Sequence, residues 1–193
     1  MNRMATRRDE RTQESRRLLV AAAAELFAEK GYRQTSFVDI AGRAGISRGS
    51  IPWHFGNKLG LLEAVVDDQL QVVLAGLPPG GEEPTGDSLD QAMGFIRLPA
   101  ARLFITLLAE AVEVGSPIRE HYARLHAALR QAVRARVAAE ALPPGTTPEA
   151  FTVLLVGAVI GVHAQWRVAP EAVDLEAVRT AILALLQAGP GRA

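Results

Sequence analysis

Apolar residues recur every three or four positions from Thr12 onward, which is the spacing of one face of an α-helix. Lys30 and Gly31 then supply a basic last turn and a helix stop. No segment alternates apolar and polar residues for long enough to predict a strand with one buried face. The first predicted helix therefore covers about 12–30, and it carries two adjacent apolar rows, Leu18, Ala22 and Leu26 beside Leu19, Ala23 and Phe27.

Capping residues mark the starts of the next three predicted helices. Ser36 and Asp39 have the spacing of a capping box, with Asp in the place of Glu, which predicts that a second helix begins between them. Ser47 is expected to cap a third helix, and Asn57 is expected to cap a fourth. The second helix is predicted to end at Gly45 and the fourth near Ala75.

A run rich in Pro and Gly over residues 76–87 is predicted to be a linker, because it can form neither a helix nor a strand. Beyond it, Pro, Gly and capping residues separate further segments of helical periodicity. The predicted fold class is therefore all-α. Helices are expected over about 88–98, 100–114, 117–141, 148–168 and 174–188.

The charge is unevenly distributed along the 193 residues, although the chain as a whole is neutral. Residues 1–60 contain 11 Lys and Arg residues against six Asp and Glu residues, so the remainder carries an equal acidic excess. This asymmetry suggests that the N-terminal part meets a polyanion, with a basic tail on a neutral domain as the alternative.

The absence of cysteine excludes a disulfide framework, thiol catalysis and cysteine-ligated metal sites. The longest uncharged apolar segment, 151–162, is shorter than the roughly 20 residues of a membrane span. Acidic residues also interrupt the basic start, so we expect no signal peptide and no membrane association. A soluble protein of the cytoplasm is predicted.

The segment 35–58 contains the most informative pattern. Two short helices can cross closely only where small residues lie at the crossing, and Ala41 fits that place. Gly45 can adopt the positive φ that a tight turn between them needs, and Ile51 provides an apolar contact that locks the pair. This is the spacing of a helix-turn-helix, here over about 36–55.

The residues around this pattern resemble the TetR family of bacterial transcriptional regulators. They are LFAEKGY at 26–32, TS at 35–36, DIA at 39–41, AGISRG at 44–49, WHF at 53–55 and NK at 57–58. Residues 1–11 are charged and lack a pattern, so a basic mobile arm is expected there, and the resemblance implies a three-helix DNA-binding domain over 12–75. It also implies a helical domain over 88–193 that binds a ligand and forms the dimer.

The resemblance further implies which residues touch DNA. Arg48 and Ser50 would face base edges, where an arginine can fork onto a guanine, and Gly49 would allow a close approach. The alternatives are that Arg48 is a solvated arginine at a helix start and that Trp53 belongs to the core. The remaining expected contacts, to phosphate or sugar, are made by Thr35, Ser36, Trp53, His54 and Lys58.

Pro52 departs from the family pattern, which usually has a phosphate-contacting tyrosine there. Proline lacks that hydroxyl and its own backbone donor, and it disfavours helical geometry at Ile51. A shorter or kinked recognition helix is therefore expected.

Two further sets of residues follow from the C-terminal pattern. The resemblance implies that the helices of 95–122 enclose an effector cavity, which their apolar and aromatic residues would line with a few polar groups, or else these residues simply fill the core. Gly157 and Gly161 permit close helix contact, and with the apolar face of the last helix they suggest a dimer. The expected effector residues are Phe95, Leu98, Arg102, Phe104, Leu108 and Tyr122, and the expected dimer residues are Gly157, Gly161, Leu175, Val178, Ile182 and Leu185.

The predicted function is a dimeric repressor that binds a palindromic double-stranded DNA operator and is released by a small lipophilic effector. An all-helical module whose basic face binds an acidic protein is the alternative, and an all-α enzyme is a distant one. No metal or cofactor is expected, because His121, His126 and His163 lack metal-site spacing and no catalytic constellation is recognisable.

Overall fold

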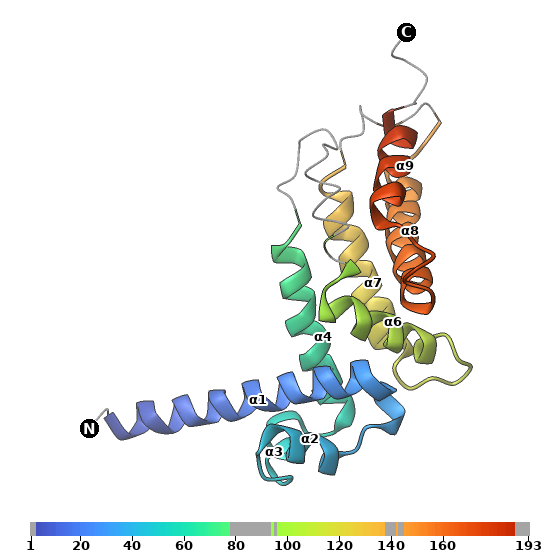
Figure 1. Ribbon diagram of the computed structural model, residues 1–193. Helices are drawn as coiled ribbons and strands as arrows, with labels where there is room; N and C mark the ends of the chain where they lie inside the picture. Colours follow the sequence, from blue (N-terminus) through green and yellow to red (C-terminus); the bar gives the residue numbers. More distant parts are fainter. Residues whose placement is uncertain (1–2, 78–93, 95, 138–141, 143–144, 188–193) are drawn as a thin grey trace. The chain divides into compact units, whose positions relative to one another are not determined.

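The computed structural model describes residues 3–77, 94, 96–137, 142 and 145–187. Within these residues the chain forms eight helices and no strand, so the predicted all-α fold class is confirmed. The helices, shown in Figure 1, are α1 (Arg3–Gln34), α2 (Phe37–Ala44), α3 (Ser50–Phe55), α4 (Lys58–Ala75), α6 (Pro99–Ala111), α7 (Arg119–Arg134), α8 (Pro148–Val168) and α9 (Leu175–Gln187).

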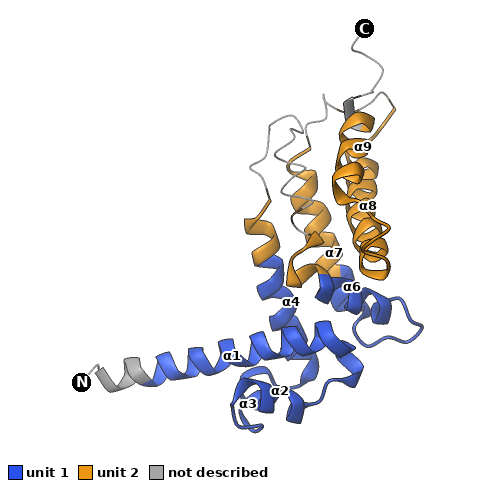
Figure 2. Cartoon of the chain, viewed as in Figure 1, with its two compact units in different colours: residues 1–71, 102–123 blue, residues 72–101, 124–193 orange. Residues whose placement is uncertain are grey.

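The chain divides into two compact units, which Figure 2 shows in different colours. Unit 1 contains residues 1–71 and 102–123, and unit 2 contains residues 72–101 and 124–193. Each unit is therefore built from two separate stretches of the chain, which alternate between the units along the sequence. The domain boundaries inferred from the sequence, at 12–75 and 88–193, stay predictions.

Helix α1 starts nine positions earlier than the pattern predicts, so residues 3–11 continue the helix. These residues lack apolar periodicity, but the Arg, Met, Glu and Ala among them are good helix formers. The predicted stop at Gly31 is a kink with φ 84° and ψ 167°, after which the helix continues to Gln34. Both predicted apolar rows lie in the core except Leu18, which is half-buried.

The capping box before α2 is confirmed. The Ser36 hydroxyl accepts from the Asp39 N–H at 3.2 Å, and the Ser36 N–H donates to the Asp39 carboxylate at 2.8 Å. Gly45 ends the helix in the left-handed region at φ 65°, where a residue with a side chain would be strained. Its N–H donates to the Ala41 carbonyl, so the turn predicted from the sequence forms.

The prediction that Ser47 caps the third helix is wrong. Residues 47–49 form a turn, and α3 begins at Ser50 with no side-chain cap. The position of Pro52 explains the later start. In a helix capped by Ser47 its missing N–H would break an internal hydrogen bond, whereas here it lies in the first turn, where the N–H has no helical partner in any case.

Asn57 caps α4 as predicted, because its side-chain oxygen accepts from the Gly60 N–H at 3.0 Å. A Cβ on Gly60 would overlap the carbonyl oxygen of Phe55, so this glycine permits the close approach of α4 to the end of α3. Short connections therefore join the four N-terminal helices, and each connection contains a glycine or a capping residue.

The remaining helices follow most of the predicted boundaries. Helix α8 begins after Thr147, whose hydroxyl accepts from the Ala150 N–H at 3.2 Å, and it ends at Val168 as predicted. Helix α7 begins two positions later than predicted, after a turn, and it ends at Arg134. Residues 135–137 are not helical, so the helix predicted over 117–141 is too long, and most of the predicted helix 88–98 lies outside the described residues.

Candidate nucleic-acid interface

The turn before α3 and the first residues of α3 carry the predicted base-reading side chains. Arg48 and Gly49 are exposed in the turn, and Ser50 is half-buried as the first helical residue. Ile51 is fully buried and anchors α3 to the core of unit 1. The turn and the anchored helix therefore present Arg48 to solvent on a fixed backbone rather than on a free loop.

Trp53 is 68% exposed and does not belong to the core of the described chain. Its indole packs edge-on against the His54 ring, with ring centroids 4.5 Å apart. A large aromatic side chain placed in water costs hydrophobic free energy unless a partner covers it. Its exposure is therefore compatible with the predicted contact to DNA.

His54 connects α3 to α1. Its Nε2 lies 3.1 Å from the Ser15 hydroxyl, and burial together with the nearby Arg16 charge lowers the pKa of His54. The Arg16 guanidinium lies over the Phe55 ring, 5.3 Å from the centroid. Two consecutive residues of α1 thus hold two consecutive residues of α3.

Thr35 and Ser36 have different environments, although the sequence assigns both to phosphate contact. Thr35 is 1% exposed, and its hydroxyl donates to the Gly31 carbonyl at 2.7 Å. That side chain is thus directed into unit 1. Ser36 is exposed at the start of α2, where its hydroxyl is shared with Asp39, and a salt bridge joins Asp39 to Lys30 at 2.9 Å.

Lys58 is half-buried rather than freely solvated. Its ammonium donates to the Arg33 carbonyl at 3.3 Å and lies over the Tyr32 ring at 4.3 Å from the centroid. Burial lowers the pKa of Lys58, with the Glu110 and Asp39 charges opposing the shift. Lys58 therefore holds the corner between α1 and α2, in addition to any contact with phosphate.

Sequence reasoning missed a group of polar side chains, mostly on α6, that holds this corner. This group, the α6 polar stripe, consists of Arg102, Thr106, Glu110 and, just beyond the helix, Glu113. Arg102 and Thr106 both donate to the Ala28 carbonyl, at 3.1 and 3.3 Å. Glu110 accepts from the Arg33 N–H at 3.1 Å, and Glu113 pairs with the Arg33 guanidinium.

Gly31 is required where α6 meets α1. A Cβ at this position would overlap the Glu110 carboxylate, and its positive φ is strained for other residues. The spacing of 102, 106 and 110 on one helix face is a signal the sequence does contain. It could not have named the partners, because these lie more than 70 positions away.

The predicted effector residues fall in both units. Arg102 belongs to the α6 polar stripe and Leu98 is exposed, while Phe104 and Tyr122 are buried. The Tyr122 hydroxyl donates to the Phe104 carbonyl at 2.7 Å, and burial raises the Tyr122 pKa. Leu108 is half-buried, and Phe95 lies outside the described residues.

The predicted dimer residues divide between surface and interior. Gly157 is exposed and Gly161 half-buried, and a Cβ on either would meet nothing within 4 Å. Leu185 is 75% exposed, whereas Leu175 is buried against Ile96. Val178 packs against that same cluster, and Ile182 is half-buried.

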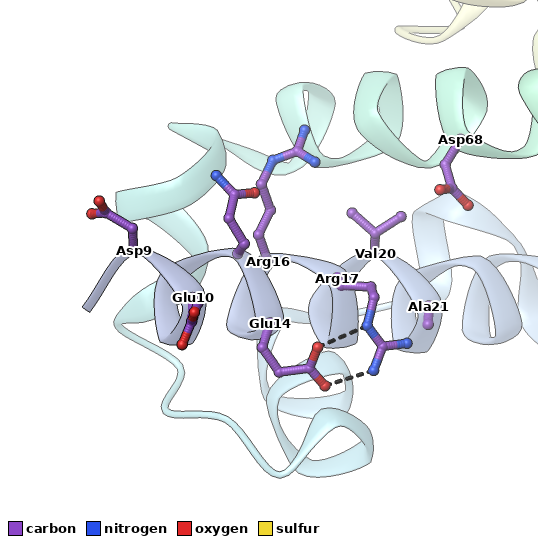
Figure 3. Close-up of a pocket in the computed structure, with 9 residues that line it drawn as sticks. Asp9, Glu10, Glu14, Arg16, Arg17, Val20, Ala21 and Asp68 are labelled. Carbon is purple, nitrogen blue, oxygen red and sulfur yellow. Dashed lines mark hydrogen bonds and ion pairs between the residues drawn. The ribbon is translucent and has the colours of Figure 1, made fainter. Parts of the chain in front are cut away.

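A surface hollow of about 890 Å³ lies beside α1, on the side shown in Figure 3. Its lining carries charges of both signs: Asp9, Glu10, Glu14 and Arg16 come from α1, and Asp68 comes from α4. Arg17 is also there, but two hydrogen bonds tie it to Glu14, at 2.6 and 2.9 Å. The hollow is therefore separate from the described residues that the sequence assigns to DNA or to an effector, since none of them lines it.

Comparisons with known proteins place this arrangement in a family. The model described as "Bacterial regulatory proteins, tetR family" matches residues 19–65. The HTH-type transcriptional regulator TtgR of Pseudomonas putida is 42% identical over 64 residues, which are 33% of this chain and 30% of TtgR. The matched segment thus spans less than a third of that relative.

Solved structures extend the likeness over nearly the whole chain. A TetR-family protein from Rhodococcus sp. is 25% identical, with a TM-score of 0.76 over 93% of this chain and 100% of its own. The SmeT–triclosan complex is 22% identical, with a TM-score of 0.65 over 83% of this chain and 84% of SmeT. With its capped α2, its glycine turn and its short α3, the chain is similar to the TetR family of bacterial regulatory proteins, in sequence over residues 19–65 and in fold over most of its length.

Proposed function

We propose that this protein is a DNA-binding transcriptional regulator, a repressor that binds a palindromic operator as a dimer. The observation that carries the proposal is the helix-turn-helix of unit 1. Its α3 is anchored by the buried Ile51, while Arg48 and Trp53 stand exposed at its start and on its outer side. An exposed arginine and an exposed indole on an anchored short helix suit a groove of DNA.

A homodimer is supported by the surface of α8. Among the residues of that helix, Phe151, Thr152 and His163 are buried, while Val153 and Leu154 are more than half exposed. By length and composition alone, α8 is long and apolar enough to cross a membrane. A helix buried in a dimer interface would have the same length and composition. Covering this face with the same face of a second chain would give two DNA-binding units and hence a two-fold operator.

A small lipophilic effector is proposed as the releasing signal. The apolar residues of α6 and α7 support this class, and triclosan is bound by SmeT, a protein of similar fold. Arg102 and Tyr122 already have partners within unit 1, so other polar groups would orient the effector. Linkage requires that an effector which prefers the DNA-incompetent state weakens DNA binding by the same factor.

The experiment is selection of genomic fragments with the purified protein, followed by titration of the selected duplex with the parent and with Arg48→Ala. We expect a palindromic site, and Arg48→Ala should lose about 1–3 kcal/mol of binding free energy and relax base choice at one position of each half-site. Arg17→Ala is the matched control, because Arg17 is tied to Glu14 on α1. Enrichment of no sequence, with affinity for an acidic protein instead, would favour the interaction-module alternative.

A further inference from the structure

A ring nitrogen in unit 2 is buried without a hydrogen-bond partner. His163 of α8 is 2% exposed, and its Nε2 has no partner among the described residues. The other ring nitrogen, Nδ1, lies 2.8 Å from the Ile96 carbonyl oxygen. A buried polar atom that makes no hydrogen bond lowers stability, so folded proteins retain few of them. Nε2 therefore calls for a partner from outside the chain.

The contact with Ile96 decides what kind of partner Nε2 can take. A carbonyl oxygen only accepts hydrogen bonds, so Nδ1 carries the proton and donates. Burial lowers the pKa of His163, the bond to Ile96 opposes this shift and the Arg167 charge adds to it, so the ring is neutral at about pH 7. A neutral ring with its proton on Nδ1 has a lone pair at Nε2. Nε2 is therefore an acceptor that lacks a donor.

The surroundings of His163 are apolar. Ile96 and Leu175 form a buried cluster, against which valines of α8 and α9 pack. Trp166 packs against the same cluster, and its ring meets the His163 ring edge-on, with centroids 6.1 Å apart. A buried water needs about three polar partners, which isoleucine, leucine and valine side chains do not supply. A largely apolar molecule with one donor suits this place better than water does.

We propose that His163 accepts a hydrogen bond at Nε2 from the effector, and that the effector is a neutral apolar molecule with one hydroxyl or N–H donor, such as an alkylphenol. The inference rests on the proposed function, in which a lipophilic effector releases DNA, and it names the group that orients this effector. A carboxylate does not fit, because it has no proton to donate. An ammonium ion does not fit either, because the Arg167 charge, which acts on His163, would repel it.

The cluster has to open for the effector to enter. The hollow beside α1 includes none of the cluster residues, so the effector would take space that side chains now fill. Trp166 and the valines are only partly buried, so they have room to turn outward. Ile96 lies three residues before the start of α6 at Pro99, so a change here acts on the segment that leads to the α6 polar stripe. The effector would thus select an altered arrangement of the chain, as release by linkage requires.

The test compares two probes that differ in the donor, para-butylphenol and its methyl ether, para-butylanisole. Calorimetry on the DNA-free protein measures the affinity for each probe. We expect the parent to bind the phenol about ten-fold more tightly than the ether, because the ether cannot donate to the buried acceptor. The benzoate with the same butyl group should bind more weakly than the phenol, because it offers no donor.

Two variants separate Nε2 from the rest of the ring. His163→Asn keeps an amide N–H near the place of Nδ1 for Ile96 but has no atom at the place of Nε2, so the preference for the phenol should disappear. His163→Gln puts an amide oxygen near the place of Nε2 and should restore the preference. Comparison of the phenol-to-ether ratio among the three proteins cancels the contribution of the extra methyl group. Circular dichroism checks that both variants keep the helix content of the parent.

Equal affinity of the parent for the two probes, no binding of the phenol, or an unchanged preference in His163→Asn would each overturn the inference. The proposed function fails in a different way. If the phenol bound with the expected preference but left the operator duplex bound, the effector role would be refuted and the His163 site would stand. Failure of the parent to bind any duplex would refute the DNA-binding proposal without changing the calorimetric result.

Discussion

Single residues show which parts of a local pattern can be predicted. Ser36 and Asp39 form the predicted capping box because both partners lie within one helical turn. Ser47 has an equally good capping side chain, but the backbone of Pro52 favours a later helix start. Thr35 looks like a surface residue in the sequence, yet its hydroxyl is directed to Gly31, since the kink of α1 brings that carbonyl within reach.

His163 allows a prediction about pH. It is 2% exposed, with Nδ1 2.8 Å from the Ile96 carbonyl oxygen and Nε2 without a hydrogen-bond partner among the described residues, and burial lowers the pKa of His163. As the pH falls below the ordinary value of about 6.5, the unfolded chain takes up protons that the folded chain does not. Stability contributed by the neutral ring is therefore lost on acidification.

We expect His163→Gln to weaken this pH dependence. Urea unfolding of parent and variant at about pH 7.5 and about pH 5 measures it, and the parent should lose more stability between the two conditions. His54 and His126, whose pKa values are also lowered, remain in both proteins and cancel in the comparison. Equal losses would show that His163 titrates normally in the fold.

At the scale of elements, the α6 polar stripe explains how the corner between α1 and α2 is fixed. Ala28, Gly31 and Arg33 each contact a residue of the stripe. Thr35, just before α2, in turn donates a hydrogen bond to the Gly31 carbonyl. The helices themselves were predictable, because periodicity and caps are local. These contacts join residues far apart in the chain, so no local pattern contains them.

Glu110→Ala should loosen this corner and lower the affinity for DNA several-fold, because the Arg33 N–H loses its acceptor. The loss in the free energy of unfolding should be about 1 kcal/mol. Hydrogen exchange at residues 33–36 and a DNA titration measure the two effects. Glu110→Gln keeps an acceptor and should restore most of the affinity.

Glu113→Gln serves as the matched control in the same stripe. It removes an exposed ion pair with Arg33, an interaction worth little in water. If it impaired DNA binding as much as Glu110→Ala, the charge around Arg33 rather than the held backbone would be responsible.

At the scale of the whole molecule, the apolar composition of 151–162 favours a buried helix, whereas a single chain leaves most of α8 at least partly exposed. Periodicity reports that a helix face is apolar but not whether its own chain covers it. Leu175 and Val178 illustrate the opposite case. Their apolar pattern suggested a dimer contact, but both pack against their own chain around Ile96.

Gly157→Leu with Gly161→Leu should convert the proposed dimer into monomers without unfolding the protomer. A Cβ at either position meets nothing within 4 Å in one chain, whereas a side chain there would separate two closely packed copies of α8. Light scattering gives the mass, and circular dichroism gives the helix content as a control. Persistence of the dimer in the double variant would move the interface away from these glycines.

The exposed apolar face of α8 also has a genetic consequence. Chains that pair through α8 would mix whenever two versions are made in one cell. A version damaged in α3 but intact in α8 would occupy normal chains in pairs that hold only one competent DNA-binding unit. Lesions around Arg48 and Trp53 would therefore behave as dominant in a cell carrying both copies, and lesions of Gly157 and Gly161 as recessive.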